Sequence, residues 1–156
     1  MIKILLDSTY ILPSFGIKVK GISDDHIIRL REAYLQGQIK FYCLTIVWVE
    51  IIGKVCKESE RLGVDVHDIL RVAIKSLLES GFYQWIAPNA EAVKLAFELR
   101  MLGHKDIIDN LLYATSITED MVFLTMDEEF KEFLRRNGFN TENIMNHEQL
   151  LEKLKS

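Results

Sequence analysis

The chain of 156 residues has the length of one ordinary domain and is long enough to bury a hydrophobic core. Apolar residues make up 49% of it and charged residues 27%, which excludes a disordered chain. Lysine plus arginine number 19 and aspartate plus glutamate 23, so the formal net charge is -4. This balance argues against a protein that coats nucleic acid through its overall charge, but it does not exclude a local contact.

The sequence predicts neither a membrane span nor a signal peptide. The longest apolar run, 41–49 (FYCLTIVWV), is far below the roughly 20 residues of a membrane span, and Asp7 interrupts the N-terminal run. Cys43 and Cys56 are too few for a disulfide framework or a zinc site. Both lie in apolar segments, so we expect two buried thiols and a reducing, cytoplasmic location.

Short apolar runs alternate with helical patterns along the chain. The first run, 2–6 (IKILL), is continuous and rich in branched residues, which is typical of a strand buried on both faces. Ser23 and Thr45 are predicted helix N-caps, and Gly37 and Gly63 are predicted to end the helices that follow them. In chain order, the predicted elements are strand 2–6, helix 22–36, strand 40–44, helix 45–61, helix 66–79, strand 83–87, helix 89–102, helix 105–118, strand 121–124, helix 127–136, strand 143–145 and helix 147–154.

This alternation indicates parallel βαβ units with right-handed crossovers. We therefore expect an α/β fold, a three-layer α/β/α sandwich with a central parallel sheet, as a single domain over residues 1–156. The two consecutive helices between about 46 and 80 predict a helical hairpin. In folds of this kind, functional sites gather beyond the carboxyl ends of the strands.

Acidic residues fall where this rule places a site. Asp7 directly follows the first predicted strand, and Thr125 and Asp127 directly follow the fourth. Glu50 lies near the start of the helix after the second strand. Asp109 lies in the first turns of the helix before the fourth strand, and that end of the helix meets the same edge of the sheet. Parallel topology therefore predicts that four carboxylates, far apart in sequence, converge.

Each acid also has an ordinary structural interpretation. An aspartate after a strand is often a turn residue or a cap, and Asp127 fits a helix N-terminus stabilised by the helix dipole. Glu50 and Asp109 interrupt the apolar runs IVWVEII and IIDNLLYA, where either a solvated stripe or a functional role explains a charge. The joint pattern favours a site. Converging carboxylates repel one another unless they protonate or bind a cation, and oxygen ligands without His or Cys favour Mg²⁺ or Mn²⁺ over zinc.

The chain resembles the PIN-domain ribonucleases, especially the VapC-type toxins of toxin–antitoxin pairs. Four pieces carry the resemblance in order over nearly the whole chain: ILLDSTYIL, VWVEII, DNLLYATS and VFLTMDEEF. The resemblance implies a PIN-like fold and a Mg²⁺- or Mn²⁺-dependent endoribonuclease that cleaves single-stranded or looped RNA through in-line attack by a metal-bound water. It also implies a homodimer, and silencing by an antitoxin peptide at the active-site groove.

The resemblance also assigns roles to individual residues. Ser8 and Thr125 match the family's flanking hydroxyl positions, whereas Asn110 and Tyr113 stand where the family has smaller residues. Four positions match the family's acidic quartet: Asp7, Glu50, Asp109 and Asp127. The resemblance therefore implies catalytic and metal-binding roles for these four residues.

Two features of the acidic pattern leave alternatives open. Asp106 precedes Asp109 by three residues on the same helix face, so either is a candidate third ligand. The small residues that follow fit better when counted from Asp109, which leaves Asp106 as a supporting acid or a dipole partner. Lys54, four residues after Glu50, and Lys105 are weaker candidates for RNA contact, and both also suit a solvated helix face.

Other functions fit parts of this pattern. A housekeeping RNA-processing nuclease would carry the same site as a toxin, whereas a non-catalytic RNA- or protein-binding module has no reason to keep four repelling acids. A haloacid-dehalogenase-like phosphatase needs a second aspartate two residues after Asp7, where Thr9 stands. A response-regulator receiver needs an acidic pair after the first strand and a lysine after the last. A metal-dependent endoribonuclease is therefore the leading hypothesis.

Overall fold

The computed structural model describes residues 1–155 and contains one five-stranded, all-parallel sheet with the order β3-β2-β1-β4-β5. The chain starts in the middle of the sheet, builds one side and then returns to build the other. This order places the carboxyl end of β1 beside that of β4, at the point where the winding reverses. The strands are β1 (Ile2–Leu6), β2 (Ile39–Leu44), β3 (Tyr83–Ile86), β4 (Val122–Leu124) and β5 (Ile144–Met145).

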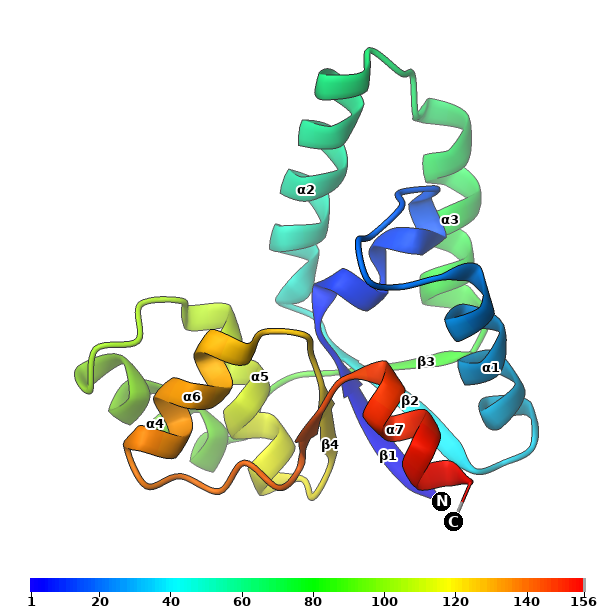
Figure 1. Cartoon of the computed structure of the whole chain (residues 1–156). Helices are drawn as coiled ribbons and strands as arrows, with labels where there is room; N and C mark the ends of the chain where they lie inside the picture. Colours follow the sequence, from blue (N-terminus) through cyan, green and yellow to red (C-terminus); the bar gives the residue numbers. More distant parts are fainter. Residues whose placement is uncertain (156) are drawn as a thin grey trace.

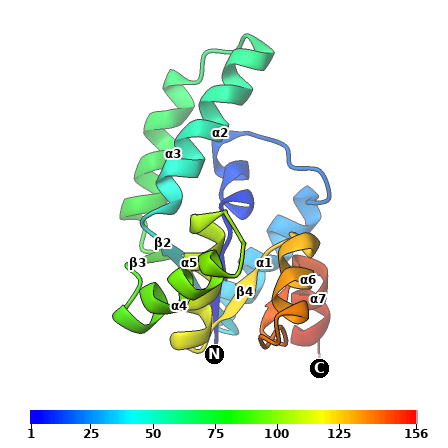
Figure 2. The ribbon, with the colours of Figure 1, turned by 90° about the vertical axis from the view of Figure 1, so that its left-hand side faces the viewer.

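Helices cover both faces of the sheet. They are α1 (Asp24–Leu35), α2 (Val47–Leu62), α3 (His67–Glu79), α4 (Ala90–Met101), α5 (Ile107–Thr118), α6 (Glu128–Arg136) and α7 (His147–Leu154). Figures 1 and 2 show α4, α5 and α6 on one side and α1 and α7 on the other. This arrangement confirms the predicted three-layer sandwich. Among residues 1–155, no helix combines the length and the apolar content needed to cross a bilayer.

The helices α2 and α3 extend beyond the carboxyl edge of the sheet (Figure 1). They run antiparallel, joined by residues 63–66, and occupy the stretch in which a helical hairpin was predicted. A short 3-10 helix, η2 (Leu12–Phe15), packs against both. At their base, Trp48 of α2 stacks on Trp85 of β3, with ring centroids 5.2 Å apart. These contacts attach the helix pair to the sheet and to the segment that follows β1.

The central strands are buried on both faces, as a continuous apolar run predicts. Ile4 and Leu5 of β1 and Phe123 and Leu124 of β4 are all fully buried. Each side chain of this kind contributes about 1.5–3 kcal/mol on burial. The sheet centre is therefore a rigid base for the polar residues that follow these two strands.

Two predictions about α2 are wrong. Thr45 does not cap α2, which begins at Val47 after an N-cap at Ile46 without a side-chain cap bond. The reason is that the Thr45 amide still donates to the carbonyl of Ile86 at 3.1 Å, so the chain has not yet left the sheet there. Cys56 is exposed, not buried, because α2 projects beyond the sheet and presents only one face to the core.

Candidate active site

The ends of β1 and β4 are joined by a chain of hydrogen bonds. The backbone amide of Asp7 donates to the Leu124 carbonyl at 3.1 Å, so the parallel ladder continues to this residue. The Thr125 hydroxyl donates to Oδ2 of Asp7 at 2.8 Å and accepts from the Asp127 amide at 3.2 Å. Asp7 and Thr125 are buried. One hydroxyl therefore fixes the position of both aspartates.

A second chain of contacts reaches Asp7 from α2. Ser8, which begins the 3-10 helix η1 (Ser8–Tyr10), points its hydroxyl toward Oδ1 of Asp7 at 3.4 Å. Lys54 Nζ donates to the Ser8 hydroxyl at 3.0 Å and lies 3.7 Å from Oε2 of Glu50, one turn earlier on α2. The other Glu50 oxygen, Oε1, is buried and has no hydrogen-bond partner. An orphaned buried carboxylate oxygen calls for a cation or a water.

The structure separates the roles of Asp106 and Asp109. Asp106 does not project from the helix face as expected, because it is the N-cap of α5 and its Oδ1 accepts from the Asp109 amide at 3.0 Å. Its side chain is exposed. Asp109 lies in the first turn of α5 and is only 9% exposed. The capping geometry therefore gives Asp106 a structural task and leaves the Asp109 carboxylate to face the site.

Burial and, after it, the charges of neighbouring acids raise the pKa values in this cluster. Burial raises the pKa of Asp109 to about 8. Burial also raises the pKa of Asp7, although the hydrogen bond from Thr125 and the charge of Lys54 lower it. Burial raises the pKa of Glu50 as well. In residues 1–155, no three carboxylates of this group come within 4.8 Å of one another. The further charges that raise the Asp109 pKa are those of Asp7, Asp106, Asp127 and Glu50.

The donor set fits a hard divalent cation. Asp7, Glu50, Asp109 and Asp127 offer only carboxylate oxygens, and the hydroxyls beside them add further oxygens, which suits Mg²⁺ or Mn²⁺. Burial is the main cause of the raised pKa values of Asp7 and Asp109, and one Glu50 oxygen is buried without a partner, so a cation bound here would stabilise the ionised carboxylates.

The two candidate cations differ in position. Lys54 lies within the site, half-exposed and paired with Glu50. Lys105 is exposed, and within residues 1–155 it makes no ion pair or side-chain hydrogen bond. The structure therefore places Lys54, but not Lys105, among the acids.

Asn110 and Tyr113, which stand where the PIN-domain pattern has smaller residues, are buried and form hydrogen bonds with loop residues. Asn110 is fully buried; its Oδ1 contacts Nδ1 of His104 at 2.8 Å, and its Nδ2 donates to the His104 carbonyl at 3.0 Å. The His104 ring stacks on Phe130 at 4.3 Å. The Tyr113 hydroxyl donates to the Asn140 carbonyl at 2.7 Å. This network was not predicted, although Asn110 is a polar residue inside the apolar run IIDNLLYA and so signals a buried polar contact.

Comparison with known proteins supports the fold but gives no sequence relative. No family model matches the sequence, and no curated protein matches it either. The crystal structure of PAE2754 from Pyrobaculum aerophilum is similar, with a TM-score of 0.59 and 20% identity over 99% of this chain and 97% of that one. A chain from a toxin–antitoxin complex of Klebsiella pneumoniae gives a TM-score of 0.53 and 13% identity over 92% and 96%. At these identities the likeness shows a shared fold.

Proposed function

We propose that the protein is a PIN-like endoribonuclease that depends on Mg²⁺ or Mn²⁺. The observation that carries this proposal is the gathering of acids from separate elements at the carboxyl edge of one parallel sheet. Asp7 follows β1, Glu50 and Asp109 come from the first turns of α2 and α5, and Asp127 precedes α6. A purely structural role would not require these charges to share a buried edge, where their repulsion is costly.

The chemistry follows from the oxygen ligands and their supports. A divalent ion held there would activate a water for attack on a phosphodiester and stabilise the leaving oxygen. Thr125 and Ser8 orient the two oxygens of Asp7. Lys54 offsets part of the charge of Glu50 and lies beside the Ser8 hydroxyl, where it can contact a substrate phosphate. The raised pKa of Asp109 favours its protonated form at neutral pH, and a bound cation would lower that pKa and favour the carboxylate.

We propose a toxin of a toxin–antitoxin pair as the biological role. The similarity in fold to a chain of the Klebsiella pneumoniae toxin–antitoxin complex supports this role. The proposed partners are an RNA substrate, an antitoxin and a second copy of the chain. A short open reading frame directly upstream, whose product relieves growth arrest, is expected for a toxin. A housekeeping RNA-processing nuclease would cleave RNA equally well, but it would have neither this upstream reading frame nor a growth arrest that its product relieves.

The second copy is expected to bind α4. Val93, Phe97 and Met101 are spaced four residues apart on this helix and form one exposed apolar stripe. The opposite side of α4, with Ala92 and Ala96, packs against α5. An exposed stripe of large apolar side chains is a typical contact surface between proteins.

The test is cleavage of a panel of tRNA and rRNA fragments with Mg²⁺, with Mn²⁺ and with EDTA. We expect cleavage only with metal, and a loss of about 100-fold or more in Asp7→Asn and Asp109→Asn because each removes a carboxylate from the metal site. Asp68→Asn, at an exposed acid in the first turn of α3, is the matched control and should cleave like the wild type.

Circular dichroism of each variant shows whether it is folded. Equal cleavage by the wild type and by both site variants would assign the activity elsewhere or to a contaminant. Binding of RNA without any metal-dependent cleavage would support the non-catalytic alternative instead.

A further inference from the structure

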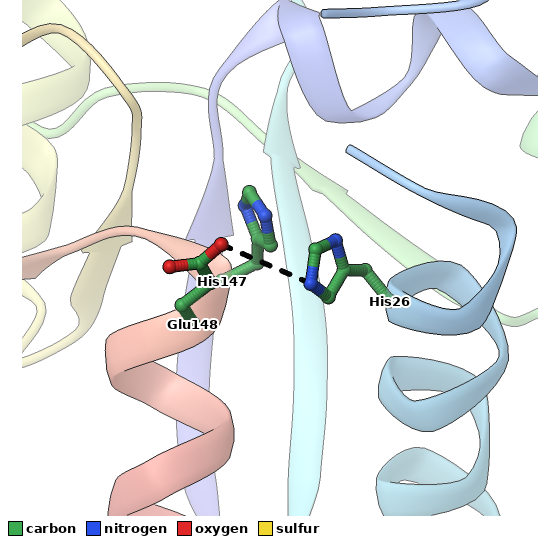
Figure 3. Close-up of side chains that lie close together, drawn as sticks. All are labelled: His26, His147 and Glu148. Atoms are coloured by element: carbon green, nitrogen blue, oxygen red, sulfur yellow. Dashed lines mark ion pairs between the residues drawn. The ribbon is translucent and has the colours of Figure 1, made fainter. Parts of the chain in front are cut away.

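Away from the acidic cluster, a second group of metal-ligand side chains lies where α1 meets α7 (Figure 3). His26 belongs to the first turn of α1, and His147 and Glu148 are the first two residues of α7. Each offers one ligand atom, and the three atoms lie within 4.8 Å of one another. Within residues 1–155, this is the one group of three or more such residues with that spacing.

His147 is the buried member of the group. It is only 2% exposed, and its Nδ1 is bound to the Tyr10 hydroxyl at 3.0 Å. The same hydroxyl accepts the His147 backbone amide at 3.1 Å. In the tautomer with its proton on Nδ1, the ring also donates to this hydroxyl and keeps the lone pair of Nε2 for a cation. Nε2 is then left buried with no hydrogen-bond partner. A buried ring nitrogen in this state needs an explanation, and a bound cation supplies one.

His26 and Glu148 complete the set. His26 Nδ1 accepts the Ser23 amide at 3.1 Å as part of the capping box of α1, so the neutral ring carries its proton on Nε2. To bind a cation through Nε2, this ring releases the Ser23 amide and carries its proton on Nδ1 instead. That Nε2 lies 3.9 Å from Oε1 of Glu148, and the His26 and His147 rings are 4.3 Å apart at their centroids. His147 therefore has the arrangement that orients metal-binding histidines, with one nitrogen held by a protein hydrogen bond and the other available, whereas His26 reaches it by releasing its capping contact.

We propose that His26, His147 and Glu148 bind a divalent transition-metal ion, with zinc as the best match. Two imidazole nitrogens and one carboxylate are a ligand set of zinc sites that leave a fourth position for water or another ligand. Glu148 is 67% exposed at its side chain, so the fourth position opens to solvent. The nitrogen ligands distinguish this site from the oxygen-only acidic cluster, which favours Mg²⁺ or Mn²⁺.

A cation here would connect two parts of the molecule that are far apart in sequence. It would fasten the start of α1 to the start of α7. Through His147 it would also restrain Tyr10, whose 3-10 helix η1 begins directly after Asp7. The proposed site thus supports the segment that carries the first acid, without taking part in the acidic cluster.

Thermal unfolding with zinc, in excess Mg²⁺ to saturate the acidic cluster, tests the proposal. With zinc about 100-fold above its Kd, we expect the wild-type Tm to rise by about 5–10 °C. His26→Gln and Glu148→Gln should lose this rise. Glutamine at position 26 can still complete the capping box of α1, so the helix start is retained.

Two matched controls keep the outcome specific. His67→Gln removes an exposed histidine of α3 outside the group and should keep the zinc-induced rise. Asp109→Asn disables the acidic cluster and should also keep it, so failure of the nuclease proposal and failure of this one are distinguishable. Co²⁺ in place of zinc should give the visible absorption of a four-coordinate nitrogen and oxygen site, absent in His26→Gln. An equal rise in His26→Gln and Glu148→Gln, no rise in the wild type, or a loss in Asp109→Asn would overturn the proposal.

Discussion

Thr125 shows how much of the acidic cluster depends on one uncharged side chain. Its hydroxyl reaches across from the end of β4 to Asp7 and also receives the Asp127 amide. It is 4% exposed, so water cannot replace it easily if it is removed. The position of two acids, and the partial relief of the charge on one of them, therefore rest on this hydroxyl.

Replacing Thr125 with valine should lower the free energy of unfolding by about 1–3 kcal/mol, because the shape is kept while Asp7 and the Asp127 amide lose a buried partner. Urea denaturation measures this difference. Thr125→Ser is the control, since it keeps the hydroxyl and loses one methyl group, at a cost of about 0.8 kcal/mol. A valine variant more stable than the serine variant would contradict the expected role of the hydroxyl.

Asp109 gives the metal-free protein a dependence on pH with a definite sign. Its folded pKa of about 8 lies above the ordinary value of 3.8, so its contribution to stability is complete below 3.8 and is lost as the pH rises through 8. Asp7 and Glu50 shift in the same direction. Burial lowers the pKa of His147, so its contribution to stability is lost as the pH falls below the ordinary value of 6.5, the opposite direction to Asp109.

We therefore expect the Tm of the wild type in EDTA to fall between pH 6.5 and 8.5 more than that of Asp109→Asn, by about 2–4 °C. Saturating Mg²⁺ should reduce the fall in the wild type and leave the variant nearly unchanged, because the cation compensates the ionised carboxylate. Thermal unfolding followed by circular dichroism provides the measurement. Parallel curves for the two proteins in EDTA would show that Asp109 is ionised in the folded protein at neutral pH.

Among the elements, local signals predicted the helix starts well. Ser23, Asn89 and Asp127 each accept a backbone amide three residues on, a contact that depends only on nearby sequence. Thr45 was wrong because a backbone partner on β3 holds it in the sheet. Asp106 was placed on the face of α5 although it is the cap, since the sequence alone does not reveal where the first turn begins.

The cap of α5 offers a direct test of the division between the two aspartates. Asp106→Asn should keep the cap and therefore the stability, whereas Asp106→Ala should lose about 1 kcal/mol of unfolding free energy. Under the proposed function, Asp106→Asn should also keep RNA cleavage within about tenfold of the wild type, in contrast to Asp109→Asn. Loss of cleavage in Asp106→Asn as severe as in Asp109→Asn would make Asp106 a ligand.

At the scale of the whole molecule, the parallel sheet and its layers followed from the alternation of strands and helices. The sequence also placed Asp7 and Asp127 at the carboxyl ends of β1 and β4, where both contact the Thr125 hydroxyl. The group of His26, His147 and Glu148 could not be predicted from the sequence. It depends on the packing of α1 against α7, and no spacing in the sequence connects two helix starts so far apart.

Assembly of two copies through α4 can be measured by size-exclusion chromatography with light scattering. We expect a dimer for the wild type and a monomer for Phe97→Lys, because a charge at the centre of the exposed apolar stripe would be buried without a partner. Val72→Lys, at an exposed apolar position of α3, should remain a dimer. A wild type that stays monomeric at every concentration, or a dimer unaffected by Phe97→Lys, would exclude this surface.

The central place of β1 also sets the order of events when the chain is made. Asp7 leaves the ribosome early, but its partner Thr125 is 118 positions further on, and β1 is flanked by β4 only after most of the chain has been translated. Such long-range pairing is slow and comes late in folding. A nascent chain that already carries Asp7, Glu50 and Asp109 still lacks Thr125, the residue that fixes the Asp7 carboxylate. The acidic cluster is therefore assembled only once β4 has paired with β1, and a nascent chain without β4 does not yet carry it.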